Sequence, residues 1–161
     1  MNIYEKLEHK AFMDGIDIID CDFDSDHIKG LYCDGVVGIN KNVITTAERS
    51  CILAEELGHH YTSAGNIIDQ SKTENVKQEQ RARMWAYNEQ IGLIGIINAY
   101  KRGCRNIHEM AEYLDVTEEF LRDALEAYRL KYGQCVVIDN YTVYFEPYMM
   151  VADFDSYDNR E

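Results

Sequence analysis

Apolar residues recur at helical spacing along most of the chain, and this pattern predicts a mostly helical protein with a few short strands. The periodic segments that we interpret as helices span residues 3–15, 46–63, 74–90, 93–100, 107–114 and 117–132. A short β-prone run at 16–19 predicts a strand. Two further pairs of runs, at 30–40 and 136–145, predict hairpins that turn at Asp34-Gly35 and Asp139-Asn140.

The predicted helix 46–63 has two different faces. Its apolar face predicts that the helix packs into a core, and it consists of Ile52, Leu53, Leu57 and Tyr61. Its polar face must line something polar, and it carries Glu55, Glu56, His59 and His60.

The spacing of the acids and histidines on this helix is that of a metal site. Glu55 and His59 are four residues apart and therefore share a face, with Glu56 between them. In the H-E-x-x-H helix of metallopeptidases, two ligands at this spacing hold zinc and the intervening Glu accepts a proton from water. Glu55 stands in the place of the first His, and a carboxylate is also a zinc ligand. The alternative is a solvated acidic face with a histidine near the helix end.

Glu79 is the candidate third ligand. It falls on the next predicted helix, at a distance along the chain where glutamate-zinc peptidases place their third ligand. Arg83, one turn later, could orient the Glu79 carboxylate. The alternative for these two residues is an ordinary surface ion pair.

The net charge of −13 on 161 residues argues against a phosphate-binding surface, because affinity for nucleic acid depends on Lys and Arg. The helices within 107–133 form a helix-turn-helix-like pair, but acids outnumber bases in it. We therefore expect no direct binding to DNA and interpret this pair as a packing or protein-docking element. A basic protein partner fits the overall charge better.

The chain length predicts one domain over residues 1–152, followed by an acidic, mobile tail at 153–161. We expect a cytoplasmic protein, since the five cysteines are odd in number and scattered, and no signal peptide or membrane span is evident.

Several motifs together resemble the ImmA/IrrE family of metallopeptidases, in particular the short forms from phages and integrative elements of Gram-positive bacteria. They are the Gly-Leu-Tyr hairpin at 30–32, Leu53-Ala-Glu-Glu-Leu-Gly-His-His-Tyr-Thr62, Gln78-Glu-Gln-Arg-Ala-Arg-Met-Trp-Ala86, Met110-Ala-Glu-Tyr-Leu-Asp-Val-Thr-Glu-Glu-Phe-Leu121 and Tyr144-Phe-Glu-Pro147.

The resemblance implies a small zincin-like α+β fold, with metal ligands at Glu55, His59 and Glu79 and the general base at Glu56. It implies Zn²⁺ as the cofactor. Glu55 departs from the family pattern, in which many relatives have His, and the oxygen-rich set that results makes Mn²⁺ or Fe²⁺ plausible competitors. His60 points about 100° away from His59 on the helix, so we expect it to support a ligand or to hydrogen-bond the substrate's oxyanion, or else to be a half-buried histidine at the rim.

Two functions are consistent with these features. The resemblance implies an endopeptidase that cleaves the basic DNA-binding repressor of a mobile element. The alternative is a catalytically impaired protein of the same fold that binds such a partner without cleaving it. We expect the substrate to add a strand to an exposed sheet edge formed by Val36, Val37, Gly38, Ile39 and Asn40. If these residues form an interior strand instead, this expectation fails.

Overall fold

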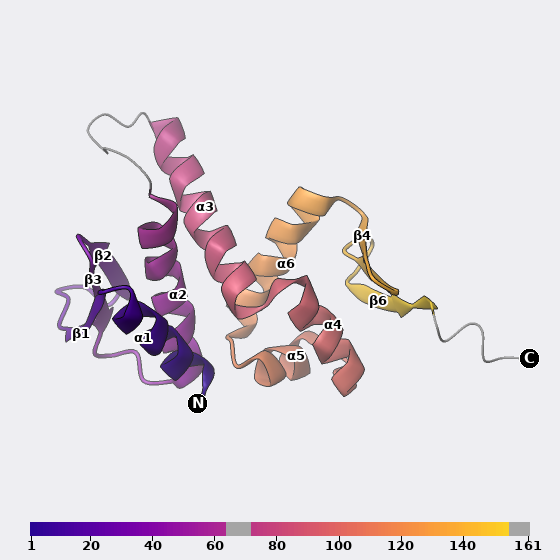
Figure 1. The fold of residues 1–161 in the computed structure, drawn as a ribbon, viewed down its shortest axis with the longest axis horizontal. Helices are drawn as coiled ribbons and strands as arrows, with labels where there is room; N and C mark the ends of the chain where they lie inside the picture. Colours follow the sequence, from indigo (N-terminus) through magenta and orange to yellow (C-terminus); the bar gives the residue numbers. More distant parts are fainter. Residues whose placement is uncertain (64–71, 155–161) are drawn as a thin grey trace, which may run out of the picture.

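The computed structural model describes residues 1–63 and 72–154, and within them it confirms an α+β fold (Figure 1). The N-terminal part contains α1 (Ile3–Met13), β1 (Asp17–Cys21), β2 (Gly30–Cys33), β3 (Val36–Asn40) and α2 (Thr46–Thr62). The rest contains α3 (Lys72–Gln90), α4 (Gly92–Arg102), α5 (Ile107–Leu114), α6 (Glu118–Tyr132), β4 (Cys135–Ile138), β5 (Tyr141–Tyr144) and β6 (Met150–Asp153).

The predicted hairpin at 30–40 is present as β2 and β3. Asp34 and Gly35 both have positive φ, at 44° and 80°, as a tight hairpin turn requires. The strand order is β1-β3-β2, so that β1 pairs in parallel with β3 and β3 is the central strand. The expectation that Val36–Asn40 forms an exposed edge is therefore wrong, because β1 covers the side of β3 that the hairpin leaves open.

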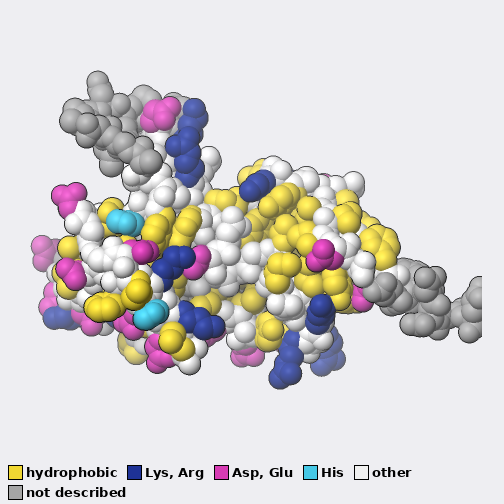
Figure 2. Space-filling model, viewed as in Figure 1, with side chains coloured by type: hydrophobic (Ala, Val, Ile, Leu, Met, Phe, Trp, Pro, Cys, Tyr) yellow, Lys and Arg dark blue, Asp and Glu magenta, His cyan; other side chains and the backbone are white. Residues whose placement is uncertain are grey.

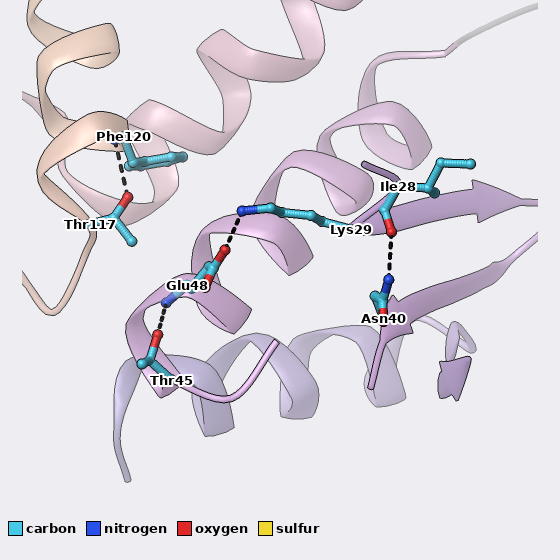
Figure 3. A network of polar contacts seen from close by, with 7 residues as sticks. All are labelled: Ile28, Lys29, Asn40, Thr45, Glu48, Thr117 and Phe120. Carbon is cyan, nitrogen blue, oxygen red and sulfur yellow. Dashed lines mark hydrogen bonds and ion pairs between the residues drawn. The ribbon is translucent and has the colours of Figure 1, made fainter. Parts of the chain in front are cut away.

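The helix that carries the candidate metal ligands is held at its N-terminus by polar contacts (Figure 3). Thr45 is the N-cap, and its side chain accepts a hydrogen bond from the Glu48 backbone N–H. Lys29 Nζ lies 2.5 Å from Glu48 Oε1, which ties the segment before β2 to the first turn of α2. Asn40 Nδ2 donates to the Ile28 carbonyl at 2.9 Å. These contacts hold the first sheet against α2.

Helices α2 and α3 run side by side in opposite directions and approach each other at Gly58 (Figure 1). A Cβ placed on Gly58 would lie 2.3 Å from the Ala82 carbonyl oxygen. Only glycine lets the two backbones come this close. Farther along the pair, Gln90 Nε2 donates to the Ser50 carbonyl at 2.9 Å, and both residues are buried.

The C-terminal elements form a second group beyond α3 (Figure 1). Thr117 caps α6 through the Phe120 N–H, and Gly133 ends it with a φ of 77°, as predicted. The predicted hairpin at 136–145 forms β4 and β5, and β6 completes a separate sheet of order β4-β5-β6. The strands of the described chain therefore divide between two small sheets.

The first two residues of the predicted tail belong to the fold. Asp153 belongs to β6, and the Phe154 N–H donates to the Asn140 carbonyl at 3.0 Å. The remainder of the predicted tail, residues 155–161, lies outside the described part of the chain, as do residues 64–71. No helix among residues 1–63 and 72–154 is both long enough and apolar enough to cross a membrane.

Candidate metal centre

The close approach of α2 and α3 brings His59 and Glu79 into contact. His59 Nε2 lies 3.3 Å from Glu79 Oε2. His59 follows Gly58 directly, and Glu79 lies nearly one turn before Ala82, so the glycine contact sets this distance. Two candidate ligands from separate helices, twenty positions apart in sequence, are thus placed together by the fold.

The Glu79 carboxylate is shared with Arg83. Arg83 Nε lies 3.4 Å from Glu79 Oε1, and both side chains are about half exposed. The ion pair that the sequence offered as the alternative for Glu79 is therefore present, and it exists together with the contact to His59. A guanidinium on one oxygen leaves the other oxygen directed at the imidazole.

Glu55 lies near this pair without touching it. Burial raises the pKa of the Glu55 carboxyl, the charge of Arg83 lowers it and that of Glu79 raises it again. In the described part of the chain, Glu55 forms no ion pair or hydrogen bond with His59 or Glu79.

The side chains of Glu55, His59 and Glu79 are of types that bind metal ions, and the spacing of His59 and Glu79 also suits one ion. Imidazole nitrogen and carboxylate oxygen are zinc ligands, and two ligands about 2.1 Å from a tetrahedral ion lie about 3.4 Å apart. The 3.3 Å between His59 and Glu79 matches that separation. Among residues 1–63 and 72–154, however, no group of three or more His, Cys, Asp or Glu side chains is arranged closely enough to hold an ion. A three-donor set would require the Glu55 side chain to rotate toward the pair.

Glu56 points to the first sheet and lies in a different environment. Burial raises the pKa of its carboxyl to about 7, the charges of Glu55 and Glu79 add to this shift, and a backbone hydrogen bond from Tyr32 opposes it. A Cβ on Gly30 would lie 3.1 Å from Glu56 Oε1, so the carboxyl packs against the start of β2. A carboxyl that titrates near neutral pH is suited to accept and return a proton.

His60 contacts the sheet through Tyr32, a residue to which the sequence analysis gave no role. The Tyr32 hydroxyl and His60 Nδ1 lie 2.7 Å apart, and the Gly35 N–H donates to the same hydroxyl at 3.2 Å. The Gly-Leu-Tyr motif marks this tyrosine in the sequence, but its contact with His60 depends on how β2 lies against α2.

The residues predicted to bind substrate as an edge strand are largely enclosed. Within β3, Val37 and Ile39 are completely buried and Asn40 is 2% exposed. The missing side chain of Gly38 makes room for Cys21 Sγ and Phe23, which a Cβ would meet at 3.0 and 3.4 Å, and not for a substrate. The outer strand of the sheet next to Glu56 is β2, and its Tyr32 N–H donates to the Glu56 carboxyl.

The predicted acidic helix pair is present as α5 and α6. Glu118 is engaged by His108 Nδ1 at 2.8 Å and by Arg122 at 3.9 Å, so part of its charge is compensated. Glu119 and Asp123, by contrast, both raise the pKa of Glu55, which places α6 beside the candidate centre.

Comparison with known proteins identifies the family of the chain. The family model of the peptidase M78 group, described as an IrrE N-terminal-like domain, matches residues 14–126, a range that contains Glu55, Glu56, His59 and Glu79. No curated protein matches the chain significantly. Since the match covers well over half of the 161 residues, the chain belongs to the ImmA/IrrE family, whose members are of the metallopeptidase type.

Proposed function

We propose that this protein is a metal-dependent endopeptidase in which Glu55, His59 and Glu79 hold the ion and Glu56 is the general base. The observation that carries the proposal is the 3.3 Å contact between His59 and Glu79, two ligand types joined from separate helices at a spacing that suits one ion. In an ordinary solvated acidic face, the helices would not need the close backbone contact at Gly58 that brings the His59 imidazole to the Glu79 carboxylate.

Each residue has a distinct task in this proposal. When bound, Zn²⁺, Mn²⁺ or Fe²⁺ would polarise the substrate carbonyl and acidify a water molecule. Glu56 accepts the proton of that water and returns it to the leaving amine. His60, held by Tyr32, donates a hydrogen bond from Nε2 to the carbonyl oxygen as negative charge develops on it. Arg83 orients Glu79.

Glu55 in place of His changes the electrostatics of the centre. Two carboxylates and one imidazole bring a divalent ion to zero net charge, whereas two imidazoles and one carboxylate leave +1. A less positive centre acidifies water less, so proton transfer to Glu56 matters more. The pKa of about 7 at Glu56 supports a role for this carboxyl in accepting the proton.

The proposed substrate is the basic DNA-binding repressor of a phage or other mobile element, and the proposed compartment is the cytoplasm. The net charge of −13 and the acids Glu119 and Asp123 on α6 support attraction of a basic partner. The edge strand β2 replaces β3 as the strand along which a peptide would pair, because β2 is an outer strand and borders Glu56.

A second candidate is a protein that binds the same partner without cleaving it. The contact of Arg83 with Glu79 favours it, because a cation already neutralises one of the proposed ligands. Glu56 separates the two functions: a docking protein has no need of a general base there.

The test is metal analysis of protein purified without chelator or nickel, comparing wild type with Glu55→Ala and Glu79→Ala. Glu74→Ala is the matched control, since Glu74 is on the same helix, is similarly exposed and pairs with Lys77. We expect both ligand variants to lose most of the metal and the control to retain it. Equal metal content in all four proteins would refute the ligand set.

A further inference from the structure

A groove separates α3 from α6 and encloses about 530 Å³. The two helices diverge from their contact, as Figure 1 shows. Its lining includes Arg83, Met84 and Tyr87 on α3, and Asp123, Ala127 and Leu130 on α6. We call this feature the α3–α6 groove.

The groove combines an apolar floor with charged side chains. Met84 and Ala127 are partly buried, Tyr87 is 5% exposed, and Leu130 is 73% exposed. Figure 2 shows hydrophobic side chains gathered over the C-terminal half of the molecule, around α6 and the second sheet. Binding sites for small molecules or single side chains have this composition, in which apolar surface supplies affinity and a few polar groups fix orientation.

The groove borders the candidate metal centre at Arg83. Arg83 lines the groove, and its Nε lies 3.4 Å from the proposed ligand Glu79. Tyr87 also lines it, and burial together with the charges of Asp123 and Glu55 raises the pKa of its hydroxyl to about 12. A polypeptide whose scissile bond lay at the metal would therefore have its next side chains at the mouth of this groove.

We propose that the α3–α6 groove binds the substrate polypeptide beside the scissile bond and accepts one large apolar side chain, such as Leu, Met or Phe. This proposal rests on the proposed peptidase function. A cavity of about 530 Å³ suits one such side chain with its adjoining backbone, within the range of about 300–1,000 Å³ for ligand pockets. Asp123 and Arg83 at the groove offer an acceptor and donors for that backbone. Selection of the cleavage site would then depend on α6, while β2 pairs with the main chain.

The first test measures binding without hydrolysis. Two pools of synthetic peptides, identical except that one carries Leu, Met or Phe where the other carries Ala, are titrated by fluorescence anisotropy onto Zn²⁺-loaded Glu56→Gln protein. We expect the apolar pool to bind at least about tenfold more tightly, the discrimination that an apolar pocket achieves. Leu130→Asp, at an already exposed position, should remove this difference, and so should Ala127→Phe, which fills the groove. Ile94→Asp, at an exposed apolar position on α4, is the matched control.

The second test measures hydrolysis of the same pools by the wild-type protein, with cleavage sites read by mass spectrometry. The groove proposal is supported if wild type cleaves beside large apolar residues and Leu130→Asp abolishes this cleavage without changing the metal content. Hydrolysis that Leu130→Asp does not alter overturns the groove proposal and leaves the peptidase function intact. If wild type hydrolyses nothing but the binding difference depends on Leu130, the peptidase function is overturned and the groove remains a binding site. Absence of both hydrolysis and selective binding overturns both.

Discussion

The Tyr32 hydroxyl lies 2.7 Å from His60 Nδ1 and at the same time accepts the Gly35 backbone N–H. The hydroxyl that accepts this N–H still has its own proton to donate, and we propose that His60 Nδ1 accepts it. His60 then carries its proton on Nε2, on the side of the ring away from the sheet. One tyrosine in the hairpin therefore sets which nitrogen of His60 offers a hydrogen bond to a substrate.

Tyr32→Phe tests this relationship. Without the hydroxyl, His60 loses its fixed tautomer and orientation, and we expect kcat for peptide hydrolysis to fall by about 10- to 100-fold, a part of what loss of an oxyanion donor costs. KM and metal content should change little. Tyr113→Phe, at an exposed tyrosine on α5, is the control. A kcat equal to that of wild type would show that His60 does not act through Tyr32.

Glu56→Gln should leave the metal content intact and abolish hydrolysis, because an amide cannot accept the proton of water. Measurement of cleavage and of bound metal on the same preparation separates the two effects. Proteolysis at a rate near that of wild type would eliminate Glu56 as the base.

The raised pKa of Glu56 also predicts how the metal-free protein responds to pH. The folded state holds this proton up to a pKa of about 7, whereas an unfolded chain releases it near 4.5, so folding binds a proton in that interval. The stabilisation is complete below pH 4.5 and is lost as the pH rises through 7. We expect the Tm of chelator-treated protein to fall between pH 5 and pH 8 more than that of Glu56→Gln, by on the order of 3 °C. Parallel curves for the two proteins would contradict the shift.

Gly58→Ala should disrupt the centre without altering any proposed ligand. Its Cβ would meet the Ala82 carbonyl oxygen at 2.3 Å, and the helices must separate to relieve that contact. We expect a loss of about 1–3 kcal/mol in the free energy of unfolding and a large loss of metal affinity, since His59 and Glu79 move apart. Gly95→Ala on α4 is the matched control, because its Cβ would meet side chains and no backbone atom, Leu114 at 3.3 Å and Ile91 at 3.7 Å. Calorimetry and metal titration of both variants provide the comparison.

Glu55→His should restore two imidazoles to the ligand set. The added positive charge favours hydroxide over water on the ion, so the pH at which activity rises should move lower, and selectivity for zinc over manganese should increase. A pH–rate profile that does not move, or that moves to higher pH, would show that Glu55 is not a ligand of the catalytic ion.

The sequence by itself determined the features that depend on neighbours a few residues apart. Thr45 and Thr117 begin helices because their side chains accept an N–H three residues on, and Asp34-Gly35 turns because both residues tolerate positive φ. The i,i+4 spacing of Glu55 and His59 places them on one helix face for the same local reason. These interactions are settled within a single turn of chain, so the candidate metal helix could be located from its residues.

Tertiary structure alone decided which strand is central and which side chains meet. The position of β3 depends on the parallel pairing with β1, a long-range contact whose free energy includes burial of Val37 and Ile39 in the core. The contact of Tyr32 with His60 and the groove beside Arg83 likewise arise from the packing of separate elements. Sequence patterns report the faces that each element must bury, but which partner buries each face is set by the packing of the whole chain.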